Sequence, residues 1–90
     1  MKDEAEKRLH ALLEQLKQER DQLRVRTHLL KADLKQEWDE VEVKLQNVET
    51  KLQNLRTSVL ESSEDIAIAA NLLVDEISNA YKRFRNAIDR

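Results

Sequence analysis

Apolar side chains recur along the chain at the spacing of a coiled coil. Near the N-terminus the apolar positions are leucines seven residues apart, at Leu9, Leu16, Leu23 and Leu30. Farther along, steps of three and four residues alternate, at Trp38, Val41, Leu45, Val48, Leu52, Leu55 and Val59. The alternating steps average about 3.5 residues, and the leucines repeat at twice that interval, so both patterns place their side chains on one line of contact with a neighbouring helix. We therefore predict that these residues form a self-association seam.

A four-residue step from Leu34 to Trp38 joins the two parts of the seam, where a step of three would keep the register. Such a stutter locally unwinds a supercoil and does not end a helix. Good helix formers stand on both sides, and no Gly, Asn or Pro is present there to end a helix. We therefore expect one continuous helix over about residues 3–60. The alternative is a break near Asp33, because Asp33 and Gln36 have the spacing of a capping box.

A third apolar stripe occupies the C-terminal part of the chain and is broader than the other two. The residues predicted to pack across a helical hairpin are Ile66, Ala70, Leu73, Ile77 and Phe84. Hydroxyl side chains gather over residues 57–63, and Ser62 with Asp65 matches a helix cap followed by an acidic residue in the first turn. We expect a turn at about 57–63 and a second helix over about 63–89.

These elements predict an all-α fold, with residues 1–90 in a single helical domain. The favoured arrangement is an antiparallel helical hairpin, or coiled coil, with a long first helix. That helix would be roughly 87 Å long, so the segment from Leu9 to Leu30 would overhang the shorter second helix. A second copy would be needed to bury it, and we expect a homo-oligomer, a dimer or higher. A break near Asp33 would instead let three helices of similar length close a monomeric bundle.

Composition narrows the possible functions. The 90 residues include no Gly, Pro or Cys, which excludes Gly-rich phosphate loops, disulfides and thiolate metal sites. The 16 basic and 18 acidic residues leave a net charge of −2, which disfavours nucleic acid as a partner. Residues 1–8 lack the apolar core of a signal peptide, and the longest apolar run covers only 66–70. We expect a cytoplasmic protein.

Residues able to carry chemistry are few. The only histidines, His10 and His28, are five helical turns apart on a continuous helix and would lie roughly 27 Å from each other. Glu6, His10 and Glu14 share a helical face, but a solvated face with ordinary i, i+4 contacts is the favoured interpretation. We predict no catalytic residue, no metal site and no cofactor, and therefore a protein that is not an enzyme.

Two features leave more than one interpretation. The favoured role of Trp38 is to fill a wide layer of the helical packing, and the other is a hot spot for binding another protein. The helix predicted over 63–89 combines a broad apolar face with a basic end at Lys82, Arg83 and Arg85, as membrane-surface helices do. The acidic first half of its polar face disfavours an anionic bilayer, so intramolecular packing is the favoured interpretation.

Two segments resemble small bacterial coiled-coil proteins of the general-stress type. The segments are KQEWDEVEVKL over residues 35–45 and AANLLVDEISNAYKRF over 69–84, and the resemblance extends over about 27–88. It implies a non-enzymatic cytoplasmic protein connected with stress tolerance, and it carries over no functional residue. The N-terminal leucine series is not part of that pattern.

Taken together, the sequence predicts a structural or adaptor module that acts through self-association and helix-mediated binding of another helical protein, and the resemblance implies a role in the stress response. The alternative is a helical protein that opens reversibly to bind a lipid or membrane surface through its amphipathic helices.

Overall fold

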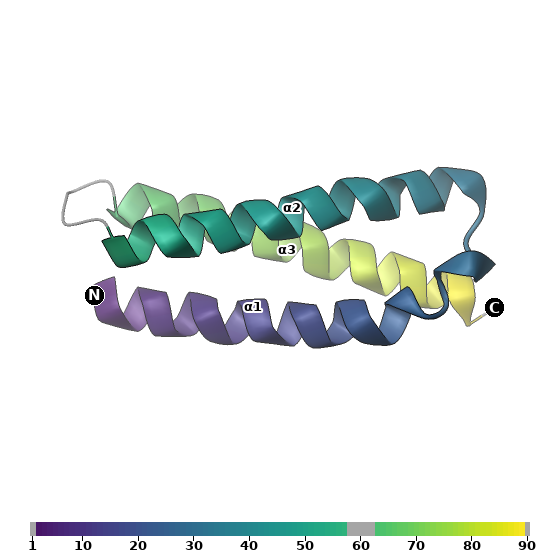
Figure 1. Cartoon of the computed structure of the whole chain (residues 1–90), viewed down its shortest axis with the longest axis horizontal. Coiled ribbons are helices and arrows are strands. Elements are labelled where there is room, and N and C mark those ends of the chain that lie inside the picture. The colour runs from purple at the N-terminus through teal and green to yellow at the C-terminus, as the bar shows by residue number, and fades with distance from the viewer. Residues whose placement is uncertain (1, 58–62, 90) are drawn as a thin grey trace.

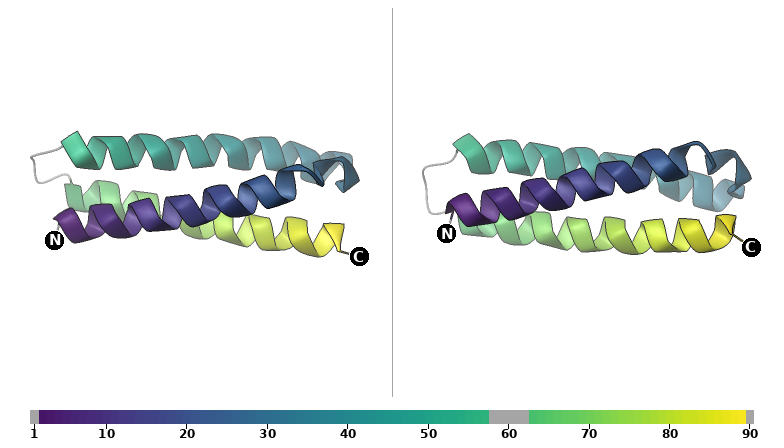
Figure 2. Two further views of the ribbon diagram at one scale, coloured as in Figure 1. Left: turned by 60° about the horizontal axis from the view of Figure 1, so that its bottom comes forward. Right: turned by 90° about the horizontal axis from the view of Figure 1, so that it is seen from below.

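The computed structural model describes residues 2–57 and 63–89, and within them the chain forms three α-helices and one short 3₁₀ helix. In chain order these are α1 (Lys2–Arg24), η1 (Thr27–Leu29), α2 (Ala32–Thr57) and α3 (Ser63–Ile88). The helices lie side by side in a bundle with extents of 45 × 19 × 16 Å. The chain direction reverses at each connection, so α1 and α3 are parallel and α2 is antiparallel to both (Figures 1 and 2). The all-α prediction is confirmed.

The predicted continuous first helix is wrong, and the three-helix alternative describes the chain. The break covers residues 25–31, and Asp33 lies just after it, in the first turn of α2. There the Asp33 carboxylate accepts a hydrogen bond from the Leu34 N–H at 2.9 Å. The capping-box spacing of Asp33 and Gln36 therefore marks the start of α2, as the alternative with a break near Asp33 predicts.

The connection turns without glycine because it uses only backbone conformations open to every residue. No described residue has a positive φ. The N–H groups of Arg26, Leu29 and Leu30 each donate to a carbonyl three residues earlier, at 2.9–3.0 Å, in place of the four-residue spacing of an α-helix. The Thr27 hydroxyl donates to the carbonyl of Arg24 at 3.0 Å, which satisfies one of the exposed carbonyls that end α1. The absence of glycine therefore does not exclude a turn at this point.

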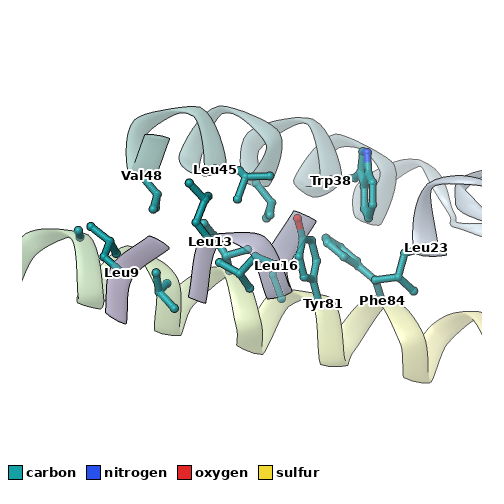
Figure 3. Close-up of a cluster of buried hydrophobic side chains, with 14 of the residues drawn as sticks. Leu9, Leu13, Leu16, Leu23, Trp38, Leu45, Val48, Tyr81 and Phe84 are labelled. Atoms are coloured by element: carbon teal, nitrogen blue, oxygen red, sulfur yellow. The ribbon is translucent and has the colours of Figure 1, made fainter. Parts of the chain in front are cut away.

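The leucine stripe of α1 explains why the chain turns here. Leu9, Leu13, Leu16 and Leu23 are all buried in the core, packed among side chains of the other two helices (Figure 3). Burial of one leucine side chain contributes about 1.5–3 kcal/mol, whereas one backbone hydrogen bond contributes a net of about 0.5–1.5 kcal/mol. A continuous helix would keep a few more hydrogen bonds but expose the whole stripe.

The core runs the length of the bundle, and α3 is the helix that the other two share. It contacts α1 and α2 more extensively than these two helices contact each other. These contacts cover both sides of the broad apolar face of α3, as expected for a helix whose apolar face is too wide for one neighbour. The core residues contributed by α3 are Ala70, Val74, Ile77, Ala80, Tyr81 and Phe84.

The second connection was predicted at residues 57–63, and most of it lies outside the described residues. Helix α2 ends at Thr57 and α3 begins at Ser63, which agrees with the two ends of that prediction. Val59 of the predicted seam and Ser62 of the predicted cap also lie outside the described residues. Asp65 stands in the first turn of α3 beside Glu64, where carboxylates favour the partially positive end of a helix.

Leu45→Ala tests the core, because this side chain is only 1% exposed. We expect a loss of about 2–5 kcal/mol in the free energy of unfolding, measured by urea denaturation with circular dichroism. Val43→Ala is the control, since Val43 lies two residues away on α2 and is 56% exposed. It should change the free energy by no more than about 0.5 kcal/mol. Equal effects of the two substitutions would contradict this packing.

Candidate functional site

The predicted self-association seam lies inside the chain's own bundle. Every described member of the seam is buried, and all of them belong to one continuous core. The expectation that the N-terminal leucines need a second copy depended on a continuous first helix, and it no longer follows once α1 folds back. In the closed bundle the described seam residues are therefore covered by the chain's own helices.

The residues predicted to pack across the hairpin lie on the inner side of α3. Ala70, Ile77 and Phe84 are fully buried, and Ile66 and Leu73 are partly buried against the same core. Helix α3 as a whole contacts α1 as well as α2, because three helices rather than two surround this core. The role of these residues in the structure is internal packing.

The three aromatic rings meet in one cluster in the core. Trp38 of α2 lies 5.4 Å from Phe84 and 5.9 Å from Tyr81 of α3, measured between ring centroids, and the rings are tilted to each other. Such tilted pairs stabilise a core beyond the area that they bury. Trp38 is buried, as its predicted role in filling a wide layer requires, and in the closed bundle it is not exposed as a binding hot spot.

The Tyr81 hydroxyl is the most unusual polar group of this core. It is buried without a hydrogen-bond partner, and Figure 3 shows it pointing from α3 toward α2. On α2, the Oε1 atom of Glu42 is also buried without a partner. Burial, reinforced by the negative charge of Glu42, raises the pKa of the Tyr81 hydroxyl above its ordinary value. Tyr81 is therefore held in its neutral form.

His10 and Glu6, two of the residues weighed as a weak metal site, instead bind a cation of the chain itself. The Arg56 guanidinium of α2 donates to Glu6 at 3.0 Å and lies 3.2 Å from the Nδ1 atom of His10. Because arginine has no acceptor, the contact with His10 requires Nδ1 to be unprotonated. Among the described residues, no group of His, Cys, Asp or Glu side chains is arranged to hold a metal ion. This cross-helix contact was not predicted, since it joins residues 50 positions apart.

Between the helices, the described residues line two of the open grooves on the surface. The larger, about 430 Å³, lies between α2 and α3 and is crossed by ion pairs from Arg83 to Glu37 and from Lys44 to Glu76, the latter at 3.2 Å. The smaller, about 170 Å³, lies between α1 and α2 beside the Arg56 contacts. Ion pairs between lining residues cross both grooves, including Lys17 with Glu49 at 3.3 Å in the smaller one.

An exposed apolar surface remains on the outer side of α3. Ile68 and Leu72 are 55% and 61% exposed and stand one helical turn apart. Exposed carboxylates near them in sequence include Glu64, Asp65 and Asp75, and no basic residue occurs from Ser63 to Tyr81. We call Ile68, Leu72 and these three carboxylates the outer α3 surface. This surface could have been predicted from the sequence, because Ile68 and Leu72 are apolar but lie outside the series of residues predicted to pack across the hairpin.

Comparison with known proteins gives no relative from which a function could be transferred: no family model, curated protein or solved structure matches this chain. No helix in residues 2–57 or 63–89 has the length and apolar character needed to cross a membrane.

Tyr81→Phe tests the unpartnered hydroxyl. At neutral pH we expect the free energy of unfolding to stay the same or rise by about 1–2 kcal/mol, because the variant no longer buries an unsatisfied polar group. A loss of more than about 1 kcal/mol in urea denaturation would instead show that the hydroxyl has a partner.

The same variant tests the raised pKa of Tyr81. Above pH about 10, the unfolded chain loses the tyrosine proton before the folded chain does, so the folded state loses stability as the pH rises. The wild-type protein should therefore lose more stability than Tyr81→Phe between neutral and strongly alkaline pH. Lysine titration is common to both proteins and cancels in the comparison. Parallel pH profiles would contradict the raised pKa.

Proposed function

We propose that this chain is a non-enzymatic helical interaction module that acts through self-association and through binding the helix of another protein. The observation that carries the second activity is the outer α3 surface, where two large apolar side chains remain exposed after the core has closed. Isolated exposed apolar residues are common on proteins, but an adjacent pair on one helical face matches the spacing of anchors in helix–helix contacts.

The charges around this pair indicate the chemistry of the partner. The outer α3 surface carries carboxylates and no basic side chain, so a partner helix with Lys or Arg beside its apolar residues would be complementary. Two apolar residues bury little area, which favours weak and reversible binding. A reversible contact of this kind suits an adaptor, and it is compatible with the stress-related role that the resemblance implies.

The outer α3 surface belongs to a helix that packs against both α1 and α2, and Figure 1 shows the three helices lying side by side. A surface on such an element is held rigid before binding, which lowers the entropy lost when a partner helix docks. The groove between α2 and α3 runs beside the same helix and contains Lys44 and Arg83, but both are paired with carboxylates across the groove. These basic groups therefore do not oppose a basic partner as free charges would.

The alternative, binding of a lipid surface, requires the bundle to open and expose its core. The helices are amphipathic, but their apolar sides face one another in the closed form. Circular dichroism and co-sedimentation with vesicles of phosphatidylcholine, with and without phosphatidylglycerol, separate the two functions. The interaction module should not sediment with either kind of vesicle, and vesicle-dependent sedimentation would favour the lipid alternative.

Leu72→Ser tests the outer α3 surface. The probe is a fluorescent synthetic helix made of leucine and lysine, with the leucines on one face, and binding is measured by anisotropy. We expect Leu72→Ser to weaken binding about five- to tenfold, because a leucine contributes about 1.5–3 kcal/mol when it is fully buried and less in a shallow contact.

Val43→Ser is the matched control, because Val43 is similarly exposed but stands on α2. It should bind the probe as the wild-type protein does, and a helix of leucine and glutamate should bind neither protein. Equal binding by Leu72→Ser and wild type, or equal weakening by the two variants, would contradict the assignment of this surface.

A further inference from the structure

The connection between α1 and α2 has an uncommon property for a tight turn: it contains no residue that breaks a helix. Residues 25–31 contain no Gly or Pro, and none of them has a positive φ. Arg26, with φ −113° and ψ 5°, and Leu30, with φ −81° and ψ 142°, both depart from helical geometry. A change in a few backbone dihedral angles would therefore convert the turn into helix without steric cost.

The apolar pattern also continues through this connection. Leu23 and Leu30 belong to the same leucine series, and the stutter at Leu34 and Trp38 is a feature of continuous coiled coils. This is why the sequence predicts one helix although the closed structure has two. Two states of the same segment, a turn and a helix, are therefore both consistent with its residues.

The bundle provides a place for α1 if the connection straightens. Helix α1 is antiparallel to α2 in the closed form (Figure 1). In two straightened copies related by a twofold axis, the α1 of each copy would again be antiparallel to α2 of the other. The leucines of α1 would return to the same core, and the ion pairs from Arg56 to Glu6 and from Lys17 to Glu49 would form between chains.

We propose that this chain forms an exchanged dimer, in which residues 2–57 become one helix and each α1 packs on α2 and α3 of a second copy. The interaction surface is the face of α2 and α3 that α1 covers in the closed bundle, and the partner is another copy of this chain. This inference develops the self-association part of the proposed function, and it does not depend on the outer α3 surface.

The exchange leaves most core contacts unchanged, so the balance between the two forms depends on the connection and on protein concentration. The exposed apolar residues of the connection also favour a second copy. Val25 and Leu29 are both exposed in the closed bundle, and the connections of the two chains would meet near the twofold axis. The straightened helix would be about 84 Å long at 1.5 Å per residue, against 45 Å for the closed bundle.

Ala32→Pro separates the two forms most strongly. Ala32 is the first residue of α2, a position where proline is well tolerated in the closed bundle. In the exchanged dimer the same position lies inside a helix, where proline is strongly unfavourable. Because the dimer contains two such positions, we expect its dissociation constant to rise on the order of 10⁴-fold, measured by sedimentation velocity over a wide concentration range.

Thr27→Ala should have the opposite effect. It removes the hydroxyl that bonds to the Arg24 carbonyl in the turn, and alanine favours helix. We expect the dissociation constant to fall on the order of tenfold. Thr50→Ala is the matched control, because the Thr50 hydroxyl makes a similar bond to the Gln46 carbonyl within α2. It should leave the dissociation constant unchanged.

Cross-linking distinguishes exchange from an ordinary surface dimer. In the variant Glu6→Cys/Arg56→Cys, the two thiols are the only ones in the chain and replace residues that contact each other across α1 and α2. A short bifunctional maleimide should join them within one chain in the monomer fraction and between two chains in the dimer fraction. Cross-links that join only thiols of the same chain in the dimer fraction would overturn the proposal. It would also be overturned if the wild-type protein and Thr27→Ala both remain monomeric at every concentration tested.

The same samples separate this inference from the proposed function. Leu72→Ser should dimerise and exchange as the wild-type protein does, because Leu72 lies outside the exchanged core. Ala32→Pro should bind the leucine–lysine helix normally while remaining monomeric. If the protein binds the leucine–lysine helix but forms no exchanged dimer, only the proposal of the outer α3 surface survives. If it forms the exchanged dimer but does not bind that helix, only the proposal of self-association survives.

Discussion

The burial of the α1 leucine stripe is the interaction on which the rest of this structure depends. A helix with leucines every seven residues cannot leave that stripe in water, and the chain must supply a second surface to cover it. In the closed bundle the covering surface comes from the same chain, through the turn over residues 25–31. Without that turn, α2 and α3 would form a two-helix hairpin with one face of its core uncovered.

Helix α3 makes this closure possible because its apolar face is wide enough for two neighbours. The aromatic cluster at one level of the bundle combines Trp38 from α2 with Tyr81 and Phe84 from α3, and the leucines of α1 pack in the same core (Figure 3). Polar contacts at the edges, such as those of Arg56 with Glu6 and His10, join α1 to α2 where their direct packing is less extensive. They are exposed and contribute little to stability, so the hydrophobic core decides the arrangement.

Much of this fold could be predicted from the pattern of apolar residues. The helical content, the inner face of α2 and the start of α3 followed from spacing and capping residues such as Asp65. The turn after Arg24 could not be predicted in the same way, because helix and turn are both compatible with residues 25–31 and only tertiary burial of the leucines selects between them. The described seam residues lie in the core of the bundle, but spacing alone does not reveal whether a contacting helix belongs to the same chain. The outer α3 surface could have been found from Ile68 and Leu72, whereas the Arg56 contacts require knowledge of the fold.

The central claim is that, in the isolated chain, α1 folds back along α2. The most direct test is the distance between spin labels at positions 10 and 53, measured by pulsed electron paramagnetic resonance in dilute solution. His10 and Gln53 line the same groove between α1 and α2. Since packed helices have axes about 8–10 Å apart, the closed bundle predicts a single short distance. A separation of about 65 Å, the length of 43 residues in one continuous helix, would contradict it.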